Sequence, residues 1–178
     1  SHYPDRWRIV KEIAYCQQGL GKTEEALETF RKLIEKYEAH FGQDDPVTLE
    51  LRQETAIEMA NQEKYEGALE IDEDVRKKRT AILGRSHPDT IYTLKEISFV
   101  LTRQKKYSKA LDICNQALKD QAAYKHSHLT DNRPDRWRLE NQIAFIQQGM
   151  GNTEQALEMF NDLSEKYKTH EDYGPEHS

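Results

Sequence analysis

The segment Gly19–Thr23 reads GLGKT, and it is the first place in the sequence where phosphate chemistry could occur. A phosphate-binding loop has the spacing GxxxxGK[ST], because its backbone amides surround the phosphates while the lysine and the hydroxyl reach the nucleotide and its Mg²⁺. With Gly21, Lys22 and Thr23 as the tail of such a loop, the first glycine would have to stand where the chain has Cys16. The motif is therefore incomplete, and we interpret the segment as a turn between two helices.

Other residue types that could bind a metal or transfer protons lack the spacing that such sites need. His126 and His128 could ligate a metal, but no third ligand stands at a recognisable spacing from them. Adjacent carboxylates such as Glu24 and Glu25 are explained by solvated helix starts, where negative charge is favourable. No Ser/His/Asp or Cys/His arrangement is apparent in the sequence. We expect a protein that is not an enzyme and that has neither a metal nor a cofactor.

The composition limits the classes of partner. The chain of 178 residues has a formal charge of -6 and a pI near 5.7, which argue against a surface for nucleic acid or for an anionic membrane. No apolar run reaches the roughly 18 residues needed to span a bilayer. Cys16 and Cys114 are expected to be free thiols in a reducing compartment, so we expect a cytoplasmic location.

An internal repeat in the sequence predicts the secondary-structure elements of the chain. PDRWR occurs at residues 4–8 and again at 134–138, and the sequences that follow are closely similar, IVKEIAYCQQGLGKTEEALETF and LENQIAFIQQGMGNTEQALEMF. Two more degenerate copies lie between them. The aligned prolines are Pro4, Pro46, Pro88 and Pro134, and the aligned Ala-Leu pairs begin at Ala26, Ala68, Ala110 and Ala156. We predict four repeats, at approximately 4–45, 46–87, 88–133 and 134–174.

Each repeat is predicted to form a helix, a tight turn and a second helix. The proline suits the first position of the first helix, where a missing N–H costs no hydrogen bond. The alanine of the second helix lets two helices cross closely, whereas a larger side chain would overpack the crossing. A glycine follows the second helix at Gly42 and at Gly84. The third repeat is four residues longer, which predicts a loop or an extended helix end before Pro134.

This pattern resembles the tetratricopeptide repeat over essentially the whole chain. The resemblance rests on a small residue in the first helix, a glycine in the turn, a tyrosine opening the second helix, and an alanine followed four residues later by an aromatic residue. These residues are Ala14 or Ala144, Gly21 or Gly151, Tyr65 or Tyr107, and Ala26 with Phe30. The 42-residue spacing is similar to the long repeats of kinesin light chains, nephrocystin-type proteins and fungal nucleotide-binding immune-type receptors. The resemblance implies an all-α fold in which residues 1–178 form one right-handed α-α superhelix of four helix-turn-helix repeats.

The resemblance also implies that the first helices line a concave side that binds a peptide. Counted from the prolines, the side chains expected there form an aromatic row and a polar row, with one member of each row per repeat. The candidate residues are Arg8, Lys11, Tyr15, Gln53, Ile57, Tyr92, Lys95, Phe99, Arg103, Arg138, Asn141 and Phe145. The aromatic side chains would anchor an acidic-aromatic peptide, and the cations would pair with its carboxylates. The alternative is that the aromatic row only packs the first helices against their neighbours.

The two tryptophans, Trp7 and Trp137, each stand near the start of a first helix. Tryptophan is often a principal anchor in protein interfaces, which makes both residues candidates for partner binding. The alternative, which we favour, is that each side chain packs under the preceding repeat.

The expected function is a non-catalytic scaffold that binds a protein or peptide. The near-identity of the first and fourth repeats favours the ligand-sensing or oligomerisation arm of a larger, nucleotide-switched signalling receptor, because duplicated repeats let a recognition surface change by exchanging units. The alternative is a cargo adaptor similar to the kinesin light chains. We expect the chain to be part of a longer array, and the apolar ends of such an array could support self-association.

Overall fold

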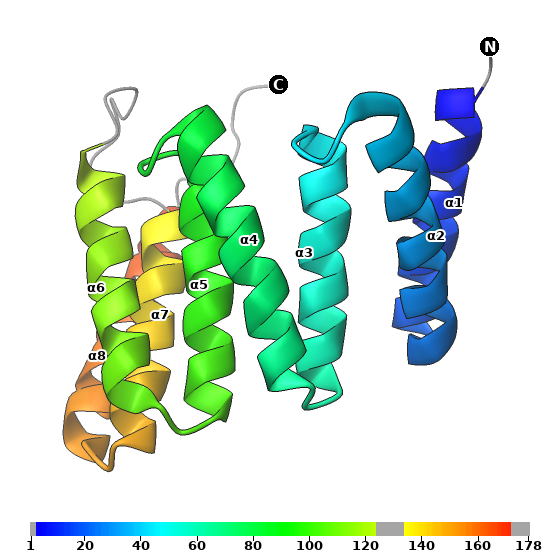
Figure 1. Ribbon diagram of the computed structural model, residues 1–178. Coiled ribbons are helices and arrows are strands. Elements are labelled where there is room, and N and C mark those ends of the chain that lie inside the picture. The colour runs from blue at the N-terminus through cyan, green and yellow to red at the C-terminus, as the bar shows by residue number, and fades with distance from the viewer. Residues whose placement is uncertain (1–2, 124–133, 172–178) are drawn as a thin grey trace. The chain divides into compact units, whose positions relative to one another are not determined.

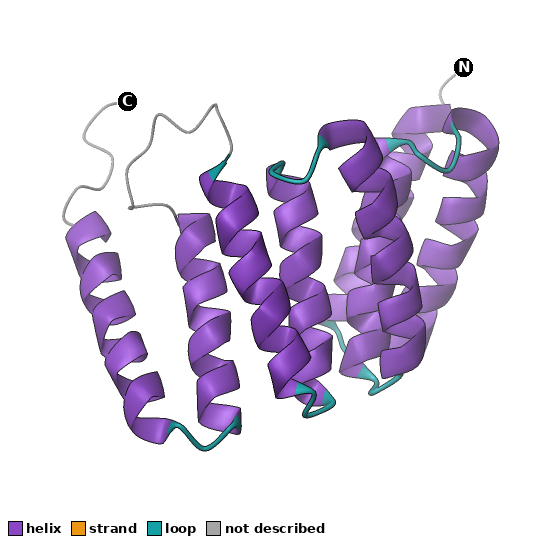
Figure 2. Ribbon diagram, turned by 60° about the vertical axis from the view of Figure 1, so that its left-hand side comes forward, coloured by secondary structure: helices purple, strands orange, loops and turns teal. Residues whose placement is uncertain are grey.

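A computed structural model describes residues 3–123 and 134–171, and every regular element in these residues is a helix (Figure 1, Figure 2). The helices are α1 (Tyr3–Gly19), α2 (Thr23–Phe41), α3 (Pro46–Asn61), α4 (Tyr65–Leu83), α5 (Pro88–Arg103), α6 (Tyr107–Ala122), α7 (Pro134–Gly149) and α8 (Thr153–Glu171). No helix in this described part of the chain combines the length and the apolar character needed to cross a membrane. The predicted all-α fold of paired helices is confirmed.

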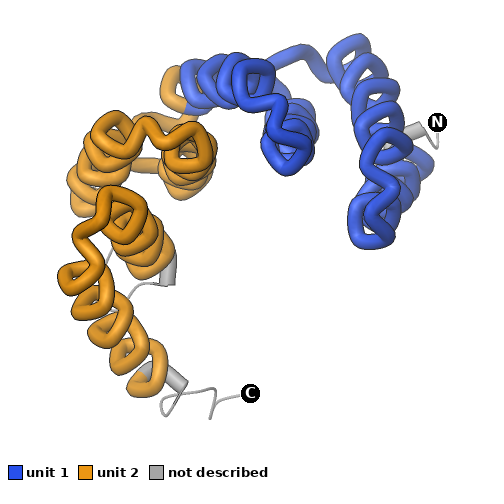
Figure 3. Tube along the Cα trace, turned by 90° about the horizontal axis from the view of Figure 1, so that it is seen from below, with its two compact units in different colours: residues 1–79 blue, residues 80–178 orange. Residues whose placement is uncertain are grey.

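The helices belong to two compact units, which Figure 3 colours separately and which divide within α4. The first unit is Ser1–Arg79, where α2 packs against α1 and against α3. The second unit is Thr80–Ser178, where α6 packs against α5 and α7, α5 also contacts α7, and α7 packs against α8. Within each unit, helices that follow one another along the chain therefore lie side by side, as helix-turn-helix repeats require.

The turn inside each helix pair has the same hydrogen-bond pattern in all four pairs. In the first turn, the Gly21 N–H donates to the Gln18 carbonyl and the Lys22 N–H donates to the Gln17 carbonyl, both at 2.9 Å. These two bonds define the Schellman motif, in which the residue after the helix end adopts a positive φ. The residues in that position are Gly21 (φ 69°), Glu63 (φ 62°), Lys105 (φ 59°) and Gly151 (φ 89°). The GLGKT segment is thus a turn between helices, as the sequence indicated.

The two connections between pairs that the structure describes are also alike. Gly42 and Gly84 follow α2 and α4 with φ values of 94° and 91°. Their carbonyls accept hydrogen bonds from the hydroxyls of Thr48 and Thr90, at 3.1 and 2.9 Å. The start of the next first helix is thereby tied to the end of the preceding second helix.

Small side chains fill the helix crossings. The alanine of each Ala-Leu pair is buried, as the repeat alignment predicted, and so is the small residue at the matching crossing position of each first helix. The buried residues are Ala26, Ala68, Ala110 and Ala156 on the second helices, and Ala14, Ala56, Ser98 and Ala144 on the first helices.

Trp7 and Trp137 are buried, which confirms packing rather than partner binding. The Trp7 ring lies 5.3 Å from the Tyr37 ring and 6.2 Å from the Phe41 ring, and the Trp137 ring lies 4.8 Å from the Tyr167 ring. These contacts are on α2 and α8, the second helices of the same pairs. The second helix returns antiparallel to the first, which brings its last turn to the start of the first helix.

Candidate protein-binding face

The side chains predicted to bind a ligand all lie on the first helices of the pairs, and in each unit we call the surface that they define the first-helix face. In the first unit this face is formed by α1 and α3, with Arg8, Lys11, Tyr15, Gln53 and Ile57. In the second unit it is formed by α5 and α7, with Tyr92, Lys95, Phe99, Arg103, Arg138, Asn141 and Phe145.

In the first unit, the predicted cation Lys11 is paired within the chain. The Lys11 ammonium and the Tyr15 hydroxyl both donate to the same Glu50 carboxylate oxygen, each at 3.0 Å, and so connect α1 to α3. Burial, followed by the negative charge of Glu50, raises the pKa of Tyr15 above its ordinary value. Gln18 adds a second connection by donating to Glu58 at 3.2 Å. Because Glu50 balances the Lys11 charge, this part of the face attracts a carboxylate less than we expected.

Gln53 departs from the expected ligand-facing row, because the structure buries it. Its side chain is only 2% exposed and lies between α3 and α4. The Gln53 carbonyl oxygen accepts a hydrogen bond from Arg79, and its amide nitrogen donates to Asp72 at 3.5 Å. Asp72 and Arg79 are buried as well, and a buried charge must be paired and hydrogen-bonded. We call these three residues the polar cluster, and Gln53 belongs to it rather than to the binding face.

Sequence reasoning missed the polar cluster, although the repeat alignment contains its signal. Counted from the prolines, Asp72 and Arg79 occupy the positions of Phe30 and Tyr37 in the first repeat. The Phe30 ring packs edge-on against Tyr15 at 5.7 Å, and Tyr37 packs against Trp7. Two charged residues at positions that are aromatic in another repeat therefore indicate a polar substitute for an aromatic contact.

In the second unit, the aromatic row remains at the surface. Phe99 on α5 is 36% exposed and Phe145 on α7 is 49% exposed, and Tyr92 is exposed near the start of α5. The Phe145 ring also packs edge-on against Phe160 on α8, with ring centroids 5.1 Å apart. Phe145 therefore fits both interpretations of the aromatic row. Part of its side chain packs against Phe160 within the pair, and the exposed part could contact a ligand.

Lys95 lies beside this aromatic row but is also paired within the chain. Its ammonium nitrogen lies 2.5 Å from a Glu96 carboxylate oxygen and 4.8 Å from the centroid of the Tyr92 ring. The carboxylate and the ring face both attract the cation. Lys95 therefore lies on the first-helix face, but Glu96 balances most of its charge.

The remaining polar side chains of this face differ in their exposure. Arg103 on α5 and Arg138 on α7 are exposed, and Asn141 is half-buried. Gln142 donates to the Thr102 hydroxyl at 3.2 Å, which joins α7 to α5 beside the aromatic row. The second unit thus presents two guanidinium groups and exposed rings on helices that are in direct contact.

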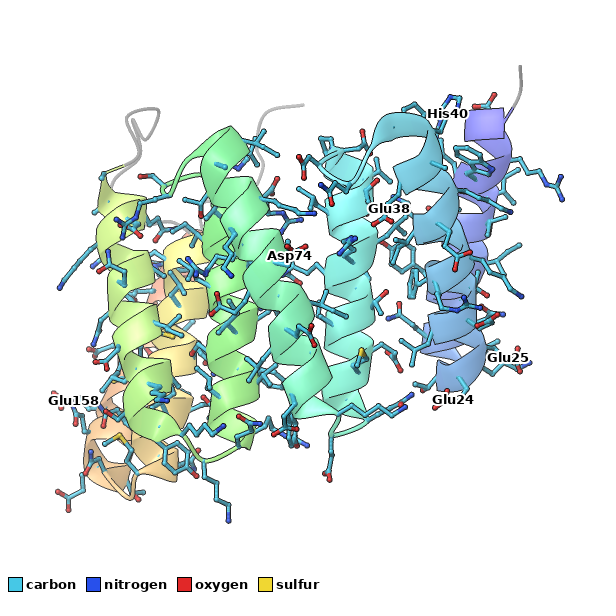
Figure 4. All side chains as sticks on the ribbon, in the orientation of Figure 1. Glu24, Glu25, Glu38, His40, Asp74 and Glu158 are labelled. Atoms are coloured by element: carbon cyan, nitrogen blue, oxygen red, sulfur yellow. The ribbon has the colours of Figure 1, made fainter. Side chains whose placement is uncertain are left out.

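Away from the first-helix face, Arg52 connects the second helices of the first unit. This α3 side chain pairs with Glu38 on α2 and, at 3.3 Å, with Asp74 on α4, and Figure 4 labels both acidic partners. Lys78 extends the network, lying 3.3 Å from Asp74 and 3.6 Å from Asp44. The surface of α3 between α2 and α4 is therefore covered by the chain's own ion pairs.

The corresponding surface of the second unit is open. Glu140 takes the place of Arg52 in the repeat alignment and pairs with Arg136 at 2.8 Å and with Lys166 at 2.9 Å. A cleft of about 400 Å³ lies over α7 between α6 and α8. Its apolar lining is Leu111, Leu118, Ile143, Met159 and Leu163. Sequence reasoning did not anticipate this cleft, because no single repeat contains its walls.

No group of three potential metal ligands occurs within residues 3–123 and 134–171. His126 and His128 lie outside these described residues. Cys16 is exposed and Cys114 is buried, and neither forms a disulfide. The Cys114 sulfur lies 2.9 Å from the Ser98 hydroxyl, and burial raises the pKa of the thiol to about 11. A thiol with that pKa is protonated at neutral pH and is a poor nucleophile.

Comparison with protein families identifies the repeat. Tetratricopeptide repeats match the chain at residues 12–39, 56–89 and 142–170, which together make up just over half of it. The chain belongs to the tetratricopeptide repeat family. Members of this family are generally protein-interaction scaffolds without catalytic activity.

Solved tetratricopeptide-type structures resemble this chain over almost its whole length. A kinesin light chain-type protein of Podosopora anserina, with nearly identical TPR-like repeats, has 20% identity and a TM-score of 0.73, with 96% of this chain and 79% of that one covered. BtubC (BKLC) from P. vanneervenii has 10% identity and a TM-score of 0.77, covering 97% and 67%. MamA from Desulfovibrio magneticus RS-1 has 18% identity and a TM-score of 0.58, covering 91% and 76%. At these identities the likeness establishes the fold. No curated protein matches the sequence.

Proposed function

We propose that this tetratricopeptide chain is a non-catalytic scaffold that captures a protein or peptide segment on its first-helix face. The observation that carries the proposal is the exposure of Phe99 and Phe145 on contacting helices that also expose Arg103 and Arg138. Aromatic rings and guanidinium groups are the side chains that most often dominate binding energy in protein interfaces. Packing within the pair leaves Phe145 49% exposed, and a bound ligand would cover the exposed part.

The ligand that fits these side chains is an extended or helical peptide with carboxylates and with aromatic or aliphatic side chains. The rings of Tyr92, Phe99 and Phe145 would anchor its apolar groups. Arg103 and Arg138 would each form charge-assisted, bidentate hydrogen bonds to a carboxylate. Nucleic acid, membranes and cofactors are not part of the proposal.

The first helices of the first unit would bind such a ligand more weakly. Arg8 is exposed on α1, and Ile57 is half-buried on α3. Lys11 and Tyr15 already bind Glu50, so a ligand would have to compete with that contact. We assign the principal anchors to the second unit because the side chains of Phe99 and Phe145 are exposed there. Asn141 and Lys95 complete the polar part of the face in that unit.

We further propose that the array is the ligand-sensing or oligomerisation arm of a larger cytoplasmic signalling protein of the nucleotide-switched receptor type. The near-identity of its first and fourth repeats supports this, since such repeats can exchange surface residues without disturbing the fold. The proposal includes the repeat boundaries 4–45, 46–87, 88–133 and 134–174, and self-association through the ends of the array.

The alternative is a cargo adaptor of the kinesin light chain kind, favoured by the likeness to the Podosopora anserina protein. The resemblance to kinesin light chains implies paired asparagines on the first helices, which hold the peptide backbone. The corresponding positions here are Lys11-Glu12, Gln53-Glu54, Lys95-Glu96 and Asn141-Gln142, so only Asn141 matches. A cargo with a different binding motif would be required.

The test is selection of ligands from a displayed library of random peptides, using the purified chain as bait. We expect the recovered peptides to be rich in aromatic residues together with aspartate or glutamate. The variant Phe99→Ala/Lys95→Ala should lose these peptides while keeping its helical circular dichroism, because it removes a central ring and the polar side chain beside it.

A matched control removes one exposed apolar side chain and one lysine away from the first-helix face. Ile82→Ala/Lys109→Ala deletes one exposed apolar side chain on α4 and one exposed lysine on α6, and it should bind the selected peptides as the wild type does. Undiminished capture by Phe99→Ala/Lys95→Ala would contradict the proposed face. So would recovery of basic peptides without aromatic residues.

A further inference from the structure

The first unit shows how the chain itself closes the surface over the first helix of a pair. Arg52 on α3 pairs with Glu38 on α2 and with Asp74 on α4, so its guanidinium group connects the two second helices that flank α3. Lys78, one turn further along α4, also pairs with Asp74, at 3.3 Å. Asp74 therefore has two cations from its own chain.

The second unit keeps the aspartate of this network but not its arginine. Counted from the prolines, the positions of Asp74, Lys78 and Arg52 are taken by Asp162, Lys166 and Glu140. Lys166 pairs with Glu140 at 2.9 Å. Asp162 is exposed, and no cation pairs with it within residues 3–123 and 134–171. The difference between the units lies in residue types, at positions that every pair contains, and it leaves a carboxylate without the arginine that its counterpart binds.

Asp162 borders the apolar cleft over α7. The cleft residues of α6 are Leu111, Asn115 and Leu118, and those of α8 include Met159 and Asp162. Spacings of three or four residues place each set along one side of its helix, so the cleft runs along the helix axes. An elongated apolar groove with a charge at its border is the kind of surface that binds the apolar side of an amphipathic helix.

We propose that this cleft binds an amphipathic helix of a partner protein, one that carries an arginine beside leucine-type side chains. The arginine would pair with Asp162, as Arg52 pairs with Asp74 in the first unit, through charge-assisted hydrogen bonds. The aliphatic side chains would cover Ile143 and Met159 on the walls of the cleft, and the flexible methionine can adapt to them. The inference goes beyond the proposed function, because the first-helix face would take an acidic ligand and this cleft a basic one.

The test is selection from a displayed library in which the exposed side of one helix of a small, stable helical protein is randomised, with the complete chain as bait. Short free peptides rarely keep a helix in water, so the random peptides selected for the first-helix face do not test the cleft. We expect the selected helices to be rich in arginine and leucine. Asp162→Lys should weaken their binding by at least about tenfold, because it removes the carboxylate and repels the arginine.

A second variant tests the comparison with the first unit. Glu140→Arg gives α7 the arginine that α3 has at the corresponding position. It should abolish binding of the selected helices, because the new guanidinium group would pair with Asp162 from within the chain. Circular dichroism checks that each variant is folded.

Two controls separate the cleft from the rest of the surface. Asp112→Lys reverses an exposed aspartate of α6 that does not line the cleft, and it should bind the selected helices as the wild type does. Phe99→Ala/Lys95→Ala should also bind them normally, whereas loss of binding in this variant would assign the helices to the first-helix face. Undiminished binding by Asp162→Lys or by Glu140→Arg would overturn the proposal. So would a selection that returns no helix, or only helices without basic residues.

Discussion

At the scale of single residues, the polar cluster of Gln53, Asp72 and Arg79 is the clearest local exception to the repeat. It places two charged groups in the interior, at positions where the first pair has Phe30 and Tyr37. Burying two opposite charges has a large desolvation cost, and well-packed apolar groups in their place are often equally or more stable. Removing only one partner is costly, because the other charge then stays buried. We therefore expect the cluster to favour the correct pairing of α3 with α4 more than it adds net stability.

This reasoning predicts strongly non-additive mutations. Asp72→Phe alone should lower the free energy of unfolding by about 3–5 kcal/mol. It removes the negative charge of the cluster and leaves the positive charge of Arg79 buried. Asp72→Phe/Arg79→Tyr copies the aromatic residues of the first pair and should recover most of that loss. Urea unfolding followed by circular dichroism measures both values. A double variant whose destabilisation equals the sum of the two single effects would show that the residues do not act as a unit.

At the scale of the elements, the four Schellman turns use one backbone geometry with two kinds of residue. Gly21 and Gly151 adopt a positive φ without strain, whereas Glu63 and Lys105 adopt it as side-chain-bearing residues. An L-residue in this left-handed region costs roughly 1–2 kcal/mol, and part of that cost is offset because glycine loses more backbone freedom on folding.

We predict that Lys105→Gly stabilises the chain by about 0.5–1 kcal/mol, since it removes the left-handed strain from an exposed turn. The reciprocal change, Gly21→Ala, should destabilise by about 1 kcal/mol, although a Cβ there would meet no atom within 4 Å. Thermal and urea unfolding of both variants provide the measurement. Because the Gly21 site has room for the methyl group, a neutral Gly21→Ala would mean that φ strain is not the governing factor.

The element scale is also where the sequence was most informative. Prolines at 46, 88 and 134 mark the first residues of α3, α5 and α7, because proline suits a helix start by its fixed φ and missing donor. The burial of Gln53 was not predictable from its own position, since Lys11, Lys95 and Asn141 occupy that position elsewhere without being buried. Its burial depends on Arg79, which lies 26 residues later on another helix. Position counting identifies the helix and its face, whereas the side chain's environment depends on the neighbouring helix.

At the scale of the whole molecule, stability is expected to come from contacts between neighbouring helices, as in other repeat proteins. In the second unit, for example, Leu139 of α7 packs with Ile91 and Ala117 of the preceding pair. Each pair is therefore stabilised by the pair beside it.

Removing the last pair should accordingly weaken the rest without unfolding it. We predict that a chain ending at residue 123 keeps its helical circular dichroism but unfolds at a lower urea concentration, since Ile91 and Ala117 lose their partner on α7. Its m value should fall to roughly three-quarters of the original, because three of the four pairs remain to be exposed. Deletion of residues 1–41 is the matched change at the other end. An unchanged unfolding midpoint would contradict coupling between neighbouring pairs.

The pairing of Trp7 with Tyr37 is reproduced by Trp137 with Tyr167, and that of Tyr15 with Phe30 by Phe145 with Phe160. Each of these contacts is complete within a single helix pair, so it moves with that pair when the gene is rearranged. Unequal crossing-over between the two PDRWR-encoding stretches would insert or delete a block running from one PDRWR copy to the next, with every reading frame and every aromatic contact retained. The gene can therefore change the length of its array in whole blocks, and related strains should carry alleles that differ by that block.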